Sequence, residues 1–282
     1  MTTNAASLSS LDLVGVRFSP SRPPNATWIA WGVERSGALA VEGIDPIGAT
    51  FAERLAKGPP RVLGLDVPLG VPLALARRLA PMVTNGSQVM ERLVASPPSD
   101  TDPVWATYSA EHPGALRLTD AITHGAPSVT AARPPLWRSL RAVGQCLWAV
   151  RDRVTLVPFD ALELSPMRPT AMEVSPPGLL RLLGLPYLHR VAGDAASVSD
   201  RTAERYAVIR GLPDAVAALG ARMELPAHIG HALTQDGGAD ALDAVLSLVS
   251  VYLATRGLWS PPPLAGPHAS RVLVEGWIVR PG

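Results

Sequence analysis

The 282-residue sequence has a single cysteine, Cys146, and a single lysine, Lys57. One cysteine excludes an internal disulfide and a thiolate metal cluster. The lysines and arginines together number 25, so the remaining 24 are arginines, and anion contacts are expected to come from guanidinium groups. The formal net charge is only +1, which gives no overall electrostatic case for nucleic-acid binding.

Long hydrophobic runs and a targeting segment are also missing. The most apolar stretch, residues 244–254, is far shorter than the roughly 20 residues of a bilayer-spanning helix, so it predicts a core helix. The first ten residues have neither the basic nor the apolar region of a secretory signal. We therefore expect a flexible N-terminus over residues 1–10, a single domain over residues 11–282, and a cytoplasmic protein without a membrane segment.

Several common catalytic motifs are absent. The sequence has no Gly-x-Ser-x-Gly elbow, no Walker loop and no dinucleotide glycine fingerprint. His228 and His231 lie three residues apart, but surface histidines explain this pair as well as a metal site does. Cys146 stands in an apolar run and is expected to be a small core residue.

A succession of short apolar runs predicts an α/β fold with a mixed sheet. Residues 11–18, 27–33 and 38–43 are separated by turn-forming residues, which predicts an antiparallel three-stranded meander. A helix from about residue 45 to residue 57 then supplies the crossover for a fourth strand, residues 62–66. That strand can pair in parallel with one of the first three.

The rest of the chain is predicted to be mostly helical. Residues 73–152 are expected to form a helical insertion beside the sheet, because prolines divide a largely helical pattern. The later elements are expected to be a fifth strand at 170–174, a short helix at 178–184, helices around 203–210 and 213–222, a long helix at about 239–256, and a closing strand at 271–279.

Acidic residues stand where several of these elements end. Asp66 ends the fourth strand and Glu173 lies near the end of the fifth. Parallel strands bring their carboxyl ends to one edge of a sheet, where open α/β sheets bind ligands. Asp243 lies one turn inside the long apolar helix, where a buried carboxylate needs a partner. Asp240 is weaker evidence, since an acid in the first turn can simply cap the helix.

The three acids Asp66, Glu173 and Asp243 together predict a site for Mg²⁺ or Mn²⁺. Both ions prefer oxygen ligands and can activate water for attack on a phosphodiester. Each acid taken singly is explained as well by a cap or by pairing with one of the arginines. The three together, each at the end of an element, make the site interpretation competitive.

Five segments resemble the DUF429 family, predicted nucleases of the ribonuclease H-like superfamily. They are GLDVPLG (64–70), RLTD (117–120), MEVSPPGLLRLLGL (172–185), DALDAVLSLVSVYLATRG (240–257) and EGWIVRP (275–281), in the family's order. The resemblance implies a ribonuclease H-like sheet. It also implies a two-metal site with carboxylates at Asp66, Glu173 and Asp243, together with a further acid on the first strand.

Arg17 occupies the position of that first-strand acid. Asp12 does not replace it easily, because five residues of extended strand separate the two by about 16 Å and place them on opposite faces. A guanidinium at this position can form an ion pair with Asp66 or Asp243 where the family has a metal.

Two functions are therefore open. The first is a metal-dependent hydrolase that acts on phosphodiester bonds of nucleic acid, with Mg²⁺ or Mn²⁺ at Asp66, Glu173 and Asp243. The second is a catalytically silent ribonuclease H-like protein that binds a nucleic acid or a protein partner.

Candidate substrate contacts extend beyond the acids. They are Arg17, Arg117, Asp120, Arg138 and Arg141. The last two belong to the segment 133–153, which has five arginines, one acid and two tryptophans. Such a segment can grip phosphates while Trp137 stacks on a base. An amphipathic helix with a solvated arginine face and tryptophans in the core is the simpler interpretation.

Overall fold

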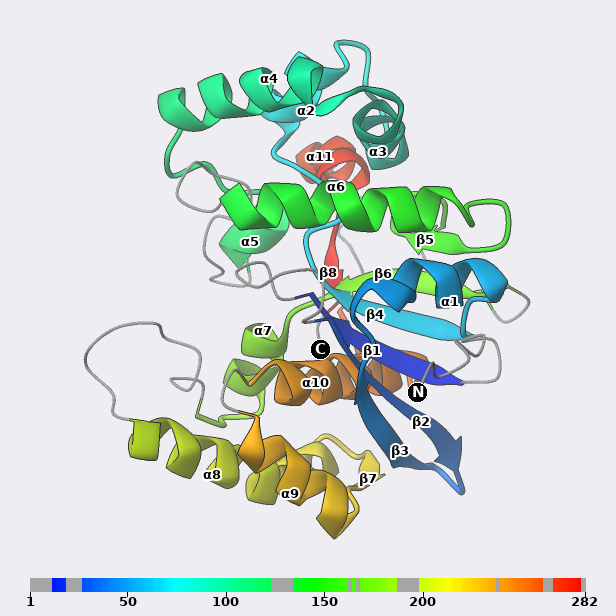
Figure 1. The fold of residues 1–282 in the computed structure, drawn as a ribbon, viewed down its shortest axis with the longest axis vertical. Helices are drawn as coiled ribbons and strands as arrows, with labels where there is room; N and C mark the ends of the chain where they lie inside the picture. The colour runs from blue at the N-terminus through cyan, green and yellow to red at the C-terminus, as the bar shows by residue number, and fades with distance from the viewer. Residues whose placement is uncertain are drawn as a thin grey trace.

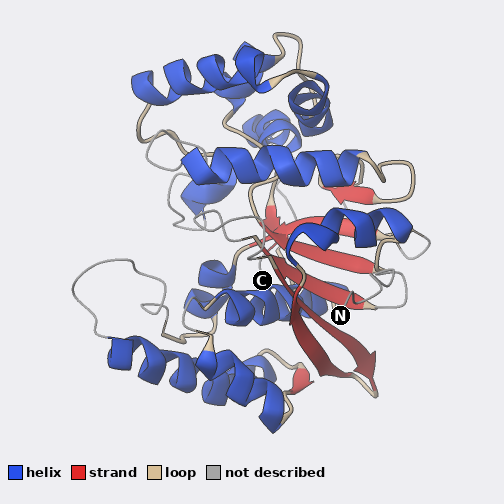
Figure 2. Cartoon of the chain, in the orientation of Figure 1, coloured by secondary structure: helices blue, strands red, loops and turns tan. Residues whose placement is uncertain are grey.

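The computed structural model describes residues 12–18, 27–122, 134–161, 164–165, 168–186, 198–236, 239–260 and 266–279. They form a mixed α/β fold around one eight-stranded sheet (Figures 1 and 2). The strands are β1 (Leu13–Arg17), β2 (Trp28–Arg35), β3 (Ala38–Pro46), β4 (Val62–Asp66), β5 (Thr155–Val157), β6 (Thr170–Val174), β7 (Arg222–Glu224) and β8 (Ile278–Val279). Their order across the sheet is β5-β6-β4-β1-β2-β3-β7, and β8 pairs with β6.

Helices surround this sheet. They are α1 (Phe51–Lys57), α2 (Leu73–Leu79), α3 (Gly86–Ala95), α4 (Pro98–Glu111), α5 (Leu118–Ile122), α6 (Pro134–Trp148), α7 (Pro176–Leu182), α8 (Val198–Ala218), α9 (Ala227–Gln235), α10 (Asp240–Thr255) and α11 (Ala269–Glu275), with short 3-10 turns η3 (Gly48–Thr50) and η5 (Gly266–His268). Within the described ranges, none of these helices has the length and apolarity to cross a membrane.

The predicted mixed sheet is confirmed. Strands β1, β2 and β3 form an antiparallel meander, and β4 pairs in parallel with β1. Gly15 and Gly64 face each other in that parallel register. A Cβ on Gly15 would lie 2.2 Å from the backbone nitrogen of Leu248, so the missing side chain lets α10 lie directly against the sheet.

The two faces of the sheet carry different helices. Helix α10 packs against β1, β2 and β4 on one face, and its residues from Asp240 to Ala254 are all buried. Helices α1 and α6 lie on the opposite side (Figure 1). Val14, Val16, Leu63 and Leu65 pack there, in one hydrophobic cluster with buried residues of these two helices. This alternation follows from the period of two along a strand.

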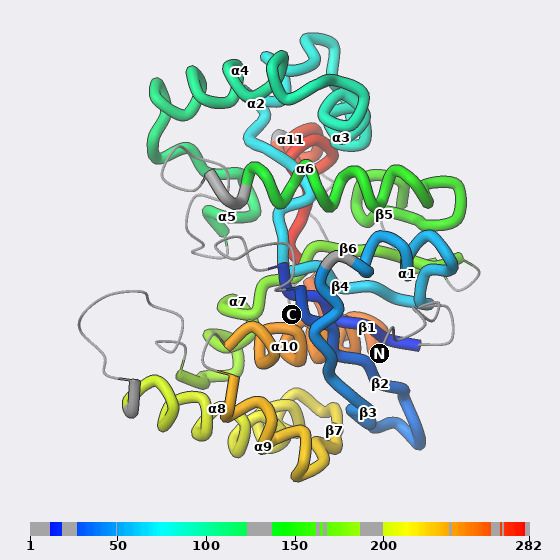
Figure 3. Tube along the Cα trace, viewed as in Figure 1, coloured from blue at the N-terminus to red at the C-terminus, as the bar shows by residue number. Residues whose placement is uncertain are grey.

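A helical layer lies beyond α6. Helices α2 to α6 occupy the part of the chain for which the sequence predicts a helical insertion. Figure 3 shows the C-terminal α11 beside α2 and α3, although these segments are far apart in the sequence. The chain runs from α11 into β8, which pairs with the end of β6, so the last residues of α11 lie close to this edge of the sheet.

Some predicted elements are wrong. The closing strand expected over 271–279 is instead helix α11 followed by the two-residue strand β8, with Gly276 at a positive φ of 82° between them. Pro213 lies inside one continuous helix, α8, rather than between two. The helix expected from about residue 45 begins at Phe51, because β3 continues to Pro46. Strands β5 and β7, three residues each, were not predicted.

Candidate functional site

The carboxyl ends of β1 and β4 bring Arg17 and Asp66 together. The two residues are opposite each other in the parallel register, so their side chains project to the same face. That face carries α10, because Arg17 and Asp66 each stand two residues beyond the glycines that contact the helix. The Arg17 side chain consequently meets Asp240 and Asp243 in the first turn of α10 as well as Asp66.

Three carboxylates surround the Arg17 guanidinium. Its Nη1 donates to Oδ2 of Asp66 at 2.6 Å, and its Nε donates to Oδ1 of Asp240 at 3.2 Å. The same Nε lies 3.5 Å from Oδ2 of Asp243. The Arg17 side chain is 16% exposed and that of Asp243 only 2%. We call these four residues the Arg17 cluster.

Electrostatic attraction between Arg17 and the three carboxylates stabilises the Arg17 cluster. Burial lowers the pKa of Arg17, but attraction by Asp66, Asp243 and Asp240 outweighs this effect, so the pKa lies above its ordinary value. The guanidinium is therefore charged at any physiological pH. With all three carboxylates ionised, they outnumber the guanidinium by two charges.

Glu173 lies on the other face of the sheet. It is opposite Leu65 in the register between β4 and β6, and Leu65 points away from α10. Because successive residues alternate between faces, Glu173 and Asp66 share an edge of the sheet but project to opposite sides. The sequence prediction placed them in one site, whereas the structure separates Glu173 from Asp66 and Asp243.

Arg117 binds Glu173 from the start of α5. Its Nη1 donates to Oε2 of Glu173 at 2.7 Å and its Nη2 to Oε1 at 2.5 Å. The same guanidinium donates to both carboxylate oxygens of Asp120, at 3.0 and 2.8 Å. The backbone N–H of Leu69, in the loop after β4, donates to Glu173 at 2.9 Å.

Glu275, at the end of α11, completes this group. Its backbone oxygen accepts from Arg117 at 3.3 Å, and its carboxylate accepts from the backbone N–H groups of Leu73 at 2.8 Å and Leu118 at 2.6 Å. We call Arg117, Asp120, Glu173 and Glu275 the Arg117 network. All four are at most 3% exposed, and they connect α5, β6 and α11 to the start of α2.

The Arg117 network contains two strongly perturbed groups. Burial raises the pKa of Glu173 above its ordinary value, and the charge and hydrogen bonds of Arg117 oppose that rise. Burial lowers the pKa of Arg117, but Asp120 and Glu173 outweigh this effect and raise it overall. Each partner therefore favours the charged form of the other against the effect of burial, as expected of a desolvated ion pair.

The predicted metal ligands do not fit a divalent cation in this arrangement. A guanidinium lies among the carboxylates of the Arg17 cluster, and Glu173 is engaged by Arg117 on the other face. Across the described parts of the chain, no group of three or more His, Cys, Asp or Glu side chains is placed to hold a metal ion. This includes His228 and His231 on α9.

Two residues of the arginine-rich segment, Arg141 and Trp137, have structural contacts. Arg141 donates to the backbone oxygens of Leu93 and Ser96 at 2.9 and 3.1 Å, and also to the Thr101 hydroxyl, so it ties α6 to α3 and α4. Trp137 is buried and donates to Asp102 at 2.8 Å. This supports the core interpretation of Trp137 over base stacking.

The remaining candidate substrate contacts differ in how much of each residue is exposed to solvent. Arg117 and Asp120 are 1% and 3% exposed, and both are engaged in the Arg117 network. Arg138 is exposed on α6.

Sequence reasoning undervalued two residues of these groups. Asp240 was treated as a helix cap, but its carboxylate accepts from Arg17. Glu275 was missed because it was assigned to a strand. Its signal was the sequence Glu275-Gly276, which is typical of a helix that ends at a glycine.

No protein-family model, no curated protein and no solved structure matches the chain.

Proposed function

We propose that this protein is a catalytically silent protein of ribonuclease H-like fold that acts as a binding module. Arg17 fills the position at which the resemblance to the DUF429 family expects a metal-binding acid. The observation that carries the proposal is the contact of its guanidinium with Asp66 at 2.6 Å and Asp240 at 3.2 Å. The mixed sheet, with its antiparallel meander and parallel fourth strand, is consistent with this fold.

The energetic balance favours the guanidinium over a divalent metal ion at this position. Mg²⁺ requires oxygen ligands at about 2.0–2.1 Å in near-octahedral geometry, and Arg17 takes the Asp66 and Asp240 oxygens that would supply them. Breaking a buried ion pair costs about 3–5 kcal/mol. The binding free energy of a metal ion would have to exceed this cost before the ion bound at all. The displaced guanidinium would also remain nearby and repel the ion.

Calorimetric titration with Mn²⁺ tests the proposal. Wild type is expected to give no binding heat at millimolar metal. Arg17→Asp removes the competing cation and adds a fourth carboxylate, so it is expected to bind Mn²⁺, and Arg17→Asp combined with Asp66→Asn is the matched control that should lose binding. Bound Mn²⁺ should also stabilise Arg17→Asp, by about 2.7 kcal/mol at a metal concentration of 100 times Kd.

Metal-dependent phosphodiester hydrolysis is the competing function. The excess of carboxylates over guanidinium in the Arg17 cluster favours it, because the cluster could still attract a cation. Mn²⁺ binding by wild type that Asp66→Asn abolishes would overturn the silent interpretation. Cleavage of single-stranded RNA or duplex DNA by wild type but not by Asp66→Asn would do the same.

A further inference from the structure

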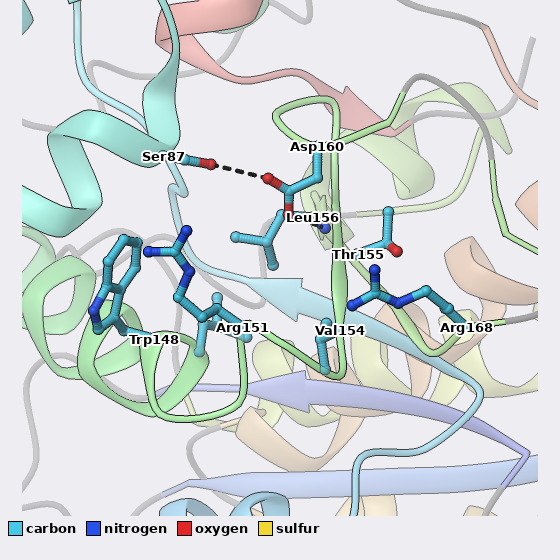
Figure 4. A pocket seen from close by; sticks show the side chains of 9 residues that line it. Ser87, Trp148, Arg151, Val154, Thr155, Leu156, Asp160 and Arg168 are labelled. Carbon is cyan, nitrogen blue, oxygen red and sulfur yellow. Dashed lines mark hydrogen bonds between the residues drawn. The ribbon is translucent and has the colours of Figure 1, made fainter.

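A polar pocket of about 240 Å³ lies apart from the Arg17 cluster. It is bounded by the first turn of α3, the end of α6 and strand β5 (Figure 4). The polar residues that line it include Ser87, Arg151, Thr155, Asp160 and Arg168. Thr155 begins β5 and Arg168 precedes β6, so the pocket adjoins the amino ends of these strands, whereas the Arg17 cluster lies at carboxyl ends.

Two arginines enter the pocket without carboxylate partners. Within the described part of the chain, neither Arg151 nor Arg168 forms an ion pair. The Arg151 guanidinium lies over the Trp148 ring, 3.9 Å from its centroid. Nη2 of Arg168 donates to the backbone oxygen of Asp152 at 2.5 Å. Figure 4 shows the two guanidinium groups on opposite sides of the pocket.

Among the described residues that line the pocket, Asp160 is the one carboxylate, and it is engaged by the protein. Oδ1 of Asp160 accepts from the Ser87 hydroxyl at 3.2 Å, and Oδ2 accepts from the backbone N–H of Leu156 at 3.0 Å. Asp160 is therefore positioned by its own neighbours rather than by the arginines. With Asp160 ionised, the described residues that line the pocket have a formal charge of +1, from two guanidinium groups and one carboxylate.

We propose that this pocket binds the phosphate group of a phosphomonoester, with Arg151 and Arg168 as its anchors. Guanidinium donors match phosphate oxygens in geometry and charge. The ring contact of Arg151 and the backbone hydrogen bond of Arg168 hold the two groups before a ligand arrives, which reduces the entropy lost on binding.

The size of the pocket limits its ligand. Pockets for drug-sized molecules measure about 300–1,000 Å³, and this one is smaller. It accommodates the phosphate and the first atoms attached to it, so the rest of the ligand projects into solvent. A small phosphorylated metabolite and the 5′-terminal phosphate of a nucleic-acid strand share this chemistry.

Calorimetry with four probes tests the proposal and separates the two sources. The probes are inorganic phosphate, glycerol 3-phosphate, and a short oligothymidylate with either a 5′-phosphate or a 5′-hydroxyl. Wild type is expected to bind inorganic phosphate. Tighter binding of the 5′-phosphorylated oligonucleotide than of glycerol 3-phosphate, with none of the 5′-hydroxyl form, identifies a strand end. Equal affinity for the two phosphomonoesters identifies a small metabolite.

Substitutions place the anion in this pocket. Arg168→Ala and Arg151→Ala are each expected to weaken phosphate binding at least about tenfold, because each removes a charged hydrogen-bond donor. Asp160→Asn should strengthen binding a few-fold by removing the repelling charge. Arg92→Ala is the matched control, since Arg92 is exposed on α3 and does not line the pocket.

Two results would overturn the proposal. One is the absence of phosphate binding to folded wild type, and the other is an equal loss in Arg92→Ala and Arg168→Ala. Arg168 is exposed, so its truncation should leave the fold intact, and circular dichroism verifies this for every variant. Arg17→Asp should keep its phosphate affinity, because this pocket functions independently of the Arg17 cluster.

Discussion

Replacing Arg117 by alanine is expected to destabilise the protein strongly. The substitution removes the cation that contacts both Asp120 and Glu173 and leaves these two carboxylates, each 3% exposed, without it. Removing one partner of a buried ion pair costs about 3–5 kcal/mol, because the remaining charge has neither water nor a counter-charge. For a domain of this size, each kcal/mol lowers Tm by about 2–4 °C, so we expect a decrease of about 6–20 °C.

Urea and thermal unfolding followed by circular dichroism measure this loss. Arg271→Ala is the matched control: Arg271 also pairs with an acid of the Arg117 network, Glu275, at 3.1 Å, but its side chain is 37% exposed. Its removal is expected to cost at most about 1 kcal/mol, as for other solvent-screened pairs. The contrast between the two arginines isolates the effect of burial from that of charge.

The pH dependence of Arg117→Ala provides a second measurement. Arg117 opposes the burial effect that raises the pKa of Glu173, so its removal should raise the pKa of the folded state further. A carboxyl whose pKa is higher in the folded than in the unfolded state binds more protons when folded. The variant should therefore recover stability as the pH falls toward the ordinary pKa of a glutamate, where the unfolded state also binds the proton.

A charge-neutral combination distinguishes lost pairing from lost packing. Arg117→Met together with Asp120→Asn and Glu173→Gln removes all three charges at similar volume, and it should recover at least half of the stability lost in Arg117→Ala. The reasoning is refuted if Arg117→Ala costs less than about 1 kcal/mol. It is also refuted if the neutral combination is no more stable than the single variant.

Three further predictions concern other parts of the fold. Gly15→Ala should destabilise the protein by about 1–3 kcal/mol or more in urea unfolding, because its Cβ would meet the Leu248 backbone at 2.2 Å. Burial raises the pKa of the Cys146 thiol, so iodoacetamide at neutral pH should modify the native protein several-fold more slowly than the urea-unfolded protein. Arg61→Ala should lower the free energy of unfolding by less than about 1 kcal/mol, measured by thermal unfolding. The side chains of its ion pair with Asp12 are 52% exposed for Arg61 and 31% exposed for Asp12, so solvent screens their attraction.

The sequence predicted the elements whose pattern is local and long enough to read. Strands β1 to β4 and β6 carry continuous apolar runs with turn-forming residues between them, and α10 is apolar on nearly every side. Strands β5 and β7 have three residues each, which is too few to establish a period. Helix α11 contains Val-Leu-Val, which favours a strand locally, but Val272 and Val274 are buried there by helix packing.

The Arg17 cluster was partly predictable for the same reason. The sequence placed Arg17 and Asp66 at the ends of β1 and β4, and only the pairing of those strands was needed to bring them together. Asp240 required knowledge of the angle at which α10 meets the sheet. Sequence pattern does not give that angle, although Gly15 permits the close approach of α10 to the sheet.

Glu173 illustrates what sequence position alone leaves open. A residue at the end of a central strand is known to reach one edge of the sheet, but the inter-strand register decides its face, and a shift of one residue reverses it. In the observed register Glu173 is opposite Leu65, so Val174, the next residue of β6, points toward α10 beside Asp66. A carboxylate at position 174 would face the Arg17 cluster, whereas the carboxylate at 173 instead forms the centre of the buried Arg117 network. The face of the sheet to which an acidic residue at a strand end projects, and hence the partners that it meets, therefore depends on a single step in register.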